Sequence, residues 1–149
     1  MMGTEVFIGE ELKQRLSGRA AGDLVLAFEW WKSAADLEYE SPVFGKDSTL
    51  FEPQINGKKY VIGHCHMIPL CDLAALAKWR RDFRLRTRKT SDRVLFYVQD
   101  GSRYYLIDIA DDPGAHDLMR MTDQQGKSFM GRIAAEAARF LDGLIELAK

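Results

Sequence analysis

The sequence has few cysteines and no long apolar run, and both absences exclude classes of protein. Its 149 residues include 2 cysteines, Cys65 and Cys71, too few for a disulfide framework, so we expect reduced core thiols and a cytoplasmic location. The longest apolar run, residues 24–28, is far shorter than the ~20 residues that span a bilayer, and no secretory signal pattern opens the chain. No dinucleotide fingerprint or phosphate-binding glycine loop occurs, so no membrane and no cofactor are expected.

Apolar periodicity predicts an α+β fold with one compact antiparallel β-sheet packed by N-terminal and C-terminal helices, in a single domain over residues 1–149. Residues 4–8 are expected to form a strand, and residues 9–17 a weak helix. Steps of three and four predict a better helix over about residues 22–37, capped by Asp23. A C-terminal helix is expected from the stripe that runs from Phe129 through Leu144 to Ala148.

Two dipeptides predict β-hairpins. Asn56-Gly57 and Asp100-Gly101 supply the positive φ values of tight turns, and both are flanked by residues that favour strands. Residues 38–49, which contain Pro42 and Gly45, are expected to be a loop. The link between the hairpins is expected to begin as a helix with a face through Leu73, Leu76, Ala77 and Arg80.

Charge is sorted along the chain although the formal net charge is only −1. Residues 1–52 carry 5 basic and 10 acidic side chains, residues 53–93 carry 10 and 3, and residues 94–149 carry 6 and 9. Half of residues 78–93 are basic. A local positive block of this kind is typical of surfaces that bind polyanions, because Lys and Arg release counterions from phosphates.

The basic block, residues 78–93, therefore indicates an RNA-binding segment. Aromatic side chains within it, Trp79 above all, could stack on unpaired bases. The alternative is a solvated face that pairs with the acidic N-terminal third. The residues expected to bind RNA are Arg80, Arg81, Arg84, Arg86, Arg93 and Trp79.

The three histidines are the residues best suited to proton transfer. His64 and His66 lie two apart in an expected strand, so both project from one sheet face, with Cys65 on the other. His116 follows the last strand, where it could reach the same face. Two histidines beside arginines suit RNA cleavage: one deprotonates the 2′-hydroxyl, one protonates the leaving 5′-oxygen, and arginines stabilise the phosphorane.

Two other interpretations of the histidines stay open. They could be polar residues on a half-exposed sheet face, or they could bind zinc with Asp92, although no compact third-ligand spacing supports a metal site. Asp92 itself precedes a strand, where it could cap a turn or orient a histidine, and the cap is the more common role.

Several short motifs occur in an order that resembles the YafO family of type II toxin–antitoxin toxins. The resemblance covers about residues 42–141. The motifs are Phe44-Gly45-Lys46-Asp47, His64-Cys65-His66, Lys89-Thr90-Ser91-Asp92, a Leu-x-Tyr strand at residues 95–97 followed by residues 105–107, Asp112-Pro113-Gly114-Ala115-His116, and a closing helix at residues 135–140.

The resemblance implies a RelE-like mRNA interferase: a ribosome-dependent, metal-independent endoribonuclease that is silenced by a cognate antitoxin. By position His64, His66, Asp92 and His116 match the family's polar residues. We expect His64 or His66 to act as the general base, His116 to act as the general acid, and Asp92 to orient a histidine or a base. Lys89 stands where the family has Arg, which keeps the charge but not bidentate phosphate binding, and Arg88 could supply that contact. The expected partners are therefore an antitoxin protein, the ribosome and mRNA. A non-catalytic RNA- or protein-binding module is the competing hypothesis.

Overall fold

The core of the protein is a five-stranded sheet with the strand order β1-β5-β4-β3-β2. The computed structural model describes residues 3–145. Neighbouring strands run antiparallel, except that β1 pairs with β5 in parallel. The predicted α+β fold is therefore confirmed, with one parallel pair added. The strands are β1 (Glu5–Ile8), β2 (Phe44–Leu50), β3 (Ile62–Met67), β4 (Val94–Asp100) and β5 (Arg103–Ala110).

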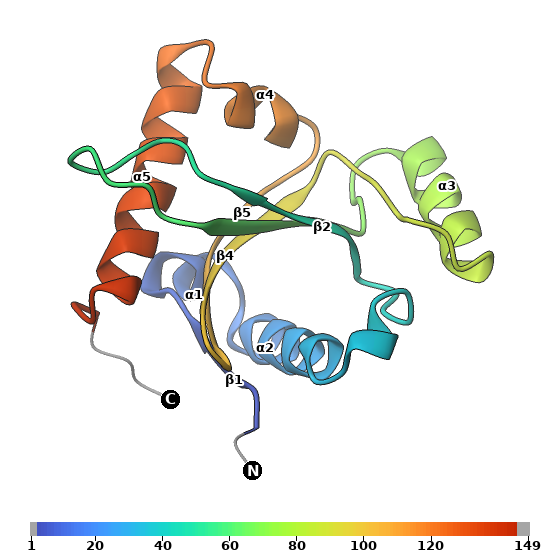
Figure 1. Cartoon of the computed structure of the whole chain (residues 1–149). Coiled ribbons are helices and arrows are strands. Elements are labelled where there is room, and N and C mark those ends of the chain that lie inside the picture. The colour runs from blue at the N-terminus through green and yellow to red at the C-terminus, as the bar shows by residue number, and fades with distance from the viewer. Residues whose placement is uncertain (1–2, 146–149) are drawn as a thin grey trace.

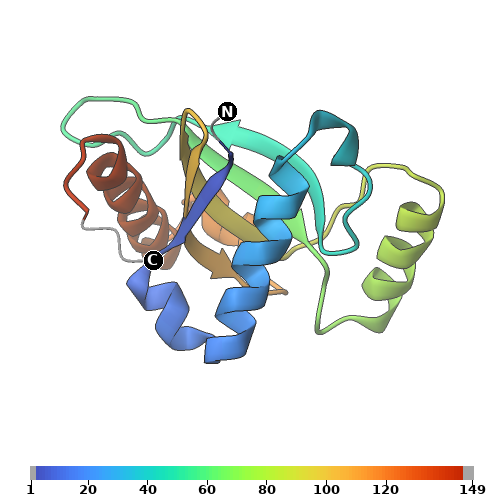
Figure 2. The same ribbon diagram turned by 90° about the horizontal axis from the view of Figure 1, so that it is seen from below.

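Helices from the two ends of the chain cover opposite faces of this sheet (Figures 1 and 2). The N-terminal pair, α1 (Glu10–Arg15) and α2 (Gly18–Lys32), covers one face. The C-terminal pair, α4 (Ala115–Arg120) and α5 (Gln124–Leu141), covers the other. The remaining helix, α3 (Leu73–Arg84), stands beside the sheet in both views.

Alternation along the strands divides the interior into two cores. On β3 and β4, Cys65 and Leu95 face the α2 side, where they join Phe28 and Trp31. Phe96 and the other residues of the opposite parity face α5. Because both faces are covered, the middle strands are largely buried on both sides, and the polar residues on them, such as His64, His66 and Asp108, are interior groups. Cys65 is buried as predicted, but Cys71 is exposed, so the prediction of a second core thiol is wrong.

Helix boundaries follow local capping. The Ser17 hydroxyl accepts a hydrogen bond from Ala20 N at 3.2 Å, so α2 begins at Gly18 and the predicted Asp23 cap is wrong. The helix ends at Lys32, and a short 3₁₀ turn over Ala35–Leu37 follows it. At the other end of the chain α5 ends at Leu141, Leu144 is 67% exposed, and Ala148 lies outside the described residues.

The two turn predictions had different outcomes. The Asp100-Gly101 hairpin joins β4 to β5, with Gly101 at φ 62°. Asn56 and Gly57 also have positive φ, and an isolated bridge joins the residues on either side of them. The regular strands lie further away, because β2 ends at Leu50 and β3 begins at Ile62. The second signal therefore marks a turn within a longer connection.

The expected loop over residues 38–49 is wrong from Phe44 onward, because β2 begins there. The strand register shifts between Phe44 and Asp47, which disturbs the alternation that would have revealed the strand. A Cβ atom on Gly45, inside this irregularity, would lie 2.3 Å from the carbonyl oxygen of Lys89. The bulge therefore brings β2 against the segment that follows α3.

Candidate functional site

His64 and His66 project from one face of β3, as predicted. The face is the one covered by α4 and α5, since Ile62 of the same parity belongs to that core. Both rings are largely covered: His64 is 8% exposed and His66 is 5% exposed. They are therefore interior groups at the edge of a core, not residues of a half-exposed sheet face.

His116 reaches the same face from the first turn of α4. Its ring centroid lies 5.1 Å from that of His66. Its side chain is 41% exposed, so it is the most accessible of the three imidazoles. The fold thus collects the three histidines, although they come from two elements separated by about fifty residues of sequence.

Asp92 holds the start of α4, including His116, in place by three hydrogen bonds. Its carboxylate accepts from the backbone N–H groups of Gly114 at 2.6 Å and His116 at 2.8 Å, and it lies 2.7 Å from His116 Nδ1. Partial burial by itself would raise the pKa of Asp92, but these backbone and ring hydrogen bonds lower it below its usual value. Asp92 therefore does both things that the sequence left open: it caps the start of α4 and it orients a histidine.

His66 is fixed by a different kind of contact. The backbone N–H of Ser91 donates to His66 Nδ1 at 2.9 Å. The Ser91 hydroxyl is itself bonded to Met67 O at 2.6 Å and to Arg93 O at 3.1 Å, so the donor is held rigidly between β3 and β4. Burial, followed by the charges of His116, His64 and Lys46, lowers the pKa of His66 to about 4. The ring is therefore neutral at physiological pH.

His64 carries an unsatisfied polar atom. Its Nδ1 is buried without a hydrogen-bond partner among the described residues. Burial lowers the pKa of His64, and the charge of Asp47 opposes this effect only in part. Leaving a buried polar atom unpaired costs about 1–3 kcal/mol, and such atoms in folded proteins are often found at functional sites.

Lys46 is a basic residue of this site that sequence analysis did not place there. Its charge acts on both His64 and His66 and lowers the pKa of each. It also lines a small hollow with Arg88 and Lys89, so Lys46 lies next to the end of the basic block. The Phe-Gly-Lys-Asp motif contains Lys46 and was the signal that could have identified it.

The basic block is divided between exposed and engaged side chains. Five of its arginines are exposed: Arg80, Arg81, Arg84, Arg86 and Arg88. Of these, Arg86 has its guanidinium paired with Glu40. Because α3 begins beside Asp92 and its arginines lie toward its other end, the arginines of α3 extend away from the histidines along one side of the molecule.

Three residues predicted to contact RNA or the reacting phosphate are interior groups instead. Trp79 is 1% exposed and donates from Nε1 to Pro42 O at 2.8 Å, so it has no free face for a base. Lys89 is also 1% exposed, and its ammonium lies over the rings of Trp79 and Phe83. The pKa of Lys89 is lowered by burial. Lys89 is therefore enclosed against Trp79 and Phe83, whereas a contact with the reacting phosphate would need an exposed ammonium.

Arg93 is the third of these residues. Its Nε donates to Asp111 at 3.1 Å and its guanidinium also contacts Ile68 O at 3.2 Å. With 9% of its surface exposed, it ties the end of β3 to the end of β5. The structure does not place Arg93 on the surface as the sequence predicted, because the side chain is buried and its charge is paired with Asp111.

No group of three or more histidine, cysteine or acidic side chains within residues 3–145 is arranged to hold a metal ion. Among the same residues, no helix is long and apolar enough to cross a membrane. A groove of about 650 Å³ borders Asp92 on the side of α3, lined in part by Leu73, Asp112 and Pro113.

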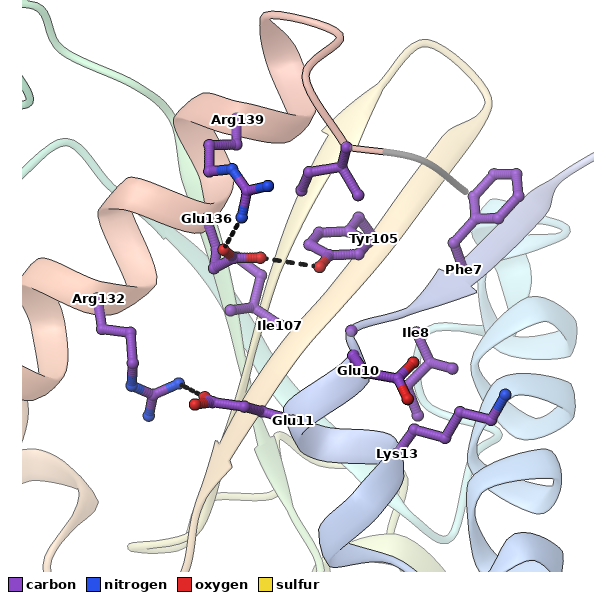
Figure 3. A pocket seen from close by; sticks show the side chains of 12 residues that line it. Phe7, Ile8, Glu10, Glu11, Lys13, Tyr105, Ile107, Arg132, Glu136 and Arg139 are labelled. Carbon is purple, nitrogen blue, oxygen red and sulfur yellow. Dashed lines mark hydrogen bonds and ion pairs between the residues drawn. The ribbon is translucent and has the colours of Figure 1, made fainter. Parts of the chain in front are cut away.

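A separate cavity of about 480 Å³ opens between α1, β1, β5 and α5 (Figure 3). Its wall carries a chain of contacts in which the Tyr105 hydroxyl donates to Glu136 and Arg139 pairs with the same carboxylate. Arg132 closes the other end through Glu11 at 2.5 Å. None of the residues predicted to act on RNA lines this cavity. The pair between Arg132 and Glu11 joins α5 to α1 across it.

Comparison with known proteins agrees with the motif order. The family sequence model described as "Toxin YafO, type II toxin-antitoxin system" matches residues 29–142. The match begins within α2, earlier than the expected start near residue 42, and it includes all three histidines and Asp92. No curated protein and no solved structure matches the chain. The chain belongs to the YafO family of toxins of type II toxin–antitoxin systems.

Proposed function

We propose that this toxin is a ribosome-dependent mRNA endonuclease in which the His116–Asp92 pair carries the proton transfer. The observation that supports the proposal most is the 2.7 Å contact between Asp92 and His116 Nδ1. A carboxylate at Nδ1 holds the neutral ring with its lone pair on Nε2, and it stabilises the imidazolium that forms when Nε2 accepts a proton. His116 is also exposed enough for a ribose to approach.

The reaction class is transesterification by the 2′-hydroxyl. His116 Nε2 accepts the 2′-hydroxyl proton as the 2′-oxygen bonds to phosphorus and the bond to the 5′-oxygen breaks. The 5′-oxygen leaves with one proton, returned by the imidazolium or by water, so protons balance over the step. The products are a 2′,3′-cyclic phosphate and a 5′-hydroxyl. This assignment makes His116 the base, whereas the sequence had placed it as the acid and His64 or His66 as the base.

Positive charge near the site comes from Lys46, whose charge acts on His64 and His66. Arg88 lines a small hollow together with Lys46. The exposed arginines of α3 continue this charge along the side of the molecule, where they would hold RNA phosphates. Ribosomal RNA and mRNA in the cytoplasm are the polyanions that this surface fits. As a toxin of a type II system, the protein has a cognate antitoxin as its partner.

The test is induced expression in a bacterial host with mapping of mRNA 5′ ends. We expect wild-type protein to arrest growth and to produce new 5′ ends phased with codons, and both effects to disappear in His116→Ala. In Asp92→Asn we expect a loss of about 10²- to 10⁴-fold in cleavage, because the amide holds the wrong tautomer. Arg120→Ala is the matched control on α4, since its side chain pairs only with Asp117 at the surface.

Two outcomes contradict the proposal. Undiminished growth arrest in His116→Ala would remove His116 from the mechanism. Growth arrest by wild-type protein without any new mRNA ends, together with salt-sensitive RNA binding, would favour the non-catalytic binding module instead.

A further inference from the structure

We infer that His66 acts as a neutral hydrogen-bond donor, which presents Nε2–H to a non-bridging oxygen of the scissile phosphate, and that it does not carry a proton in the reaction. The inference rests on the proposed endonuclease function and assigns one group within the same site. Of the three histidines, His66 is the one in which a backbone N–H donates to a ring nitrogen, so its two nitrogens can be told apart.

The tautomer of His66 follows from its partner. A backbone N–H can only donate, so the Ser91 N–H at 2.9 Å requires a lone pair on His66 Nδ1. In the neutral ring the proton must then be on Nε2. Nε2 has no hydrogen-bond partner among the described residues, and it is not one of the buried unpartnered atoms, so it reaches solvent. The ring therefore offers a donor, and no lone pair, to a ligand.

The surroundings keep the ring in this form. Protonation would have to occur at Nδ1 and would break the Ser91 contact. The groups that face His66 are His116, His64, Lys46 and Asp92, and only Asp92 favours the charged ring. Asp92 is already occupied by His116 and by the N–H groups that begin α4. Within residues 3–145, no other carboxylate acts on the His66 ring.

A neutral donor beside a proton carrier has a defined use in this reaction. As the 2′-oxygen attacks, negative charge grows on the non-bridging phosphate oxygens, and a fixed N–H directed at one of them stabilises the transition state more than the ground state. His66 lies 5.1 Å from His116, centroid to centroid, so one phosphodiester can meet both rings. A base at this position would compete with His116 for the same proton, whereas a donor complements it.

Glutamine separates the two roles. Its amide nitrogen can occupy the position of imidazole Nε2 and donate, but it cannot take up a proton at neutral pH. In a cleavage assay on translating ribosomes, we expect His66→Ala to lose about 10²- to 10³-fold in rate, the usual cost of one such donor. We expect His66→Gln to recover most of this loss. At the proton carrier, His116→Gln and His116→Ala should be equally defective.

The result that overturns the inference is an equal loss in His66→Gln and His66→Ala, with both proteins folded by circular dichroism. A second measurement does not need activity. Long-range ¹H–¹⁵N NMR of the wild-type ring should show the Nε2–H tautomer and no titration between pH 5.5 and 8. A Nδ1–H tautomer, or titration near the ordinary histidine pKa, also overturns it.

The two proposals fail separately. If wild-type protein cleaves no RNA, the endonuclease function is rejected while the NMR experiment still decides the state of His66. If wild-type protein cleaves but His66 titrates or glutamine fails to rescue, the endonuclease function stands and the donor role is rejected.

Discussion

Three imidazoles of the same chemical type have three different environments in this protein. His116 is paired with a carboxylate, His66 accepts from a backbone N–H, and His64 has a buried nitrogen without a partner within the described part of the chain. Identical side chains can therefore be assigned different tasks from their partners alone. The sequence predicted that the three would meet. The acid and base roles that it suggested could not be firm, because the roles depend on the Ser91 and Asp92 contacts, which form only on folding.

The unpaired nitrogen of His64 leads to a prediction about stability. If this nitrogen is kept for function, the His64→Leu substitution should remove an unsatisfied polar atom from an apolar environment. The free energy of unfolding at pH 7 should stay the same or rise by about 1 kcal/mol, while toxicity falls. Urea denaturation measures the first quantity and growth arrest the second. A loss of more than about 2 kcal/mol would show instead that His64 is a structural residue.

At the scale of elements, α3 shows how an amphipathic pattern can mislead. The face predicted from its apolar residues is open, with Leu73 83% exposed. The anchor is on another side of the helix, where Trp79 is buried against Pro42 and beneath the irregular start of β2. Periodicity finds a helix but not its orientation when a single large aromatic residue, instead of a stripe, makes the contact.

This anchor predicts a local effect of mutation. Trp79→Ala should lower the free energy of unfolding by about 3–5 kcal/mol, because it removes a fully buried indole and leaves a cavity. Amide hydrogen exchange should accelerate more in Leu73–Arg84 than in the sheet. Trp30→Ala is the matched control, since Trp30 is 48% exposed on α2. Uniform acceleration over the whole chain would show that α3 is not held by Trp79 in particular.

At the scale of the whole molecule, the sequence predicted the fold class and much of the order in which helices and strands follow one another along the chain. Asp100-Gly101 located the central hairpin, and the stripe around Ile133 located α5. The parallel pairing of β1 could not be predicted, because it joins residues about a hundred positions apart with no local signal. The burial of Lys89 and Arg93 was also missed, since charge in a sequence does not reveal which basic side chains fold inward.

Burial of neutral His66 makes the stability of the whole molecule depend on pH. Its pKa is about 4 in the folded protein, against 6.5 for an ordinary histidine, so between these values the unfolded chain binds the proton and the folded chain does not. Stability is therefore full above pH 6.5 and should fall by up to about 3 kcal/mol as the pH drops toward 4. Urea unfolding between pH 7.5 and 4.5 measures the slope, which should become shallower in His66→Gln. A slope identical in the two proteins would contradict this origin.

The chemistry of the cut ends tests the proposed reaction most directly. Purified protein would be added to ribosomes paused on a defined mRNA, and the new 5′ ends would be examined for a hydroxyl or a phosphate, beside a parallel reaction with His116→Ala. We expect 5′-hydroxyl ends and 2′,3′-cyclic phosphates from wild-type protein and no cleavage from the variant. Ends that carry a 5′-phosphate, or equal cleavage by both proteins, would contradict attack by a 2′-hydroxyl activated by His116.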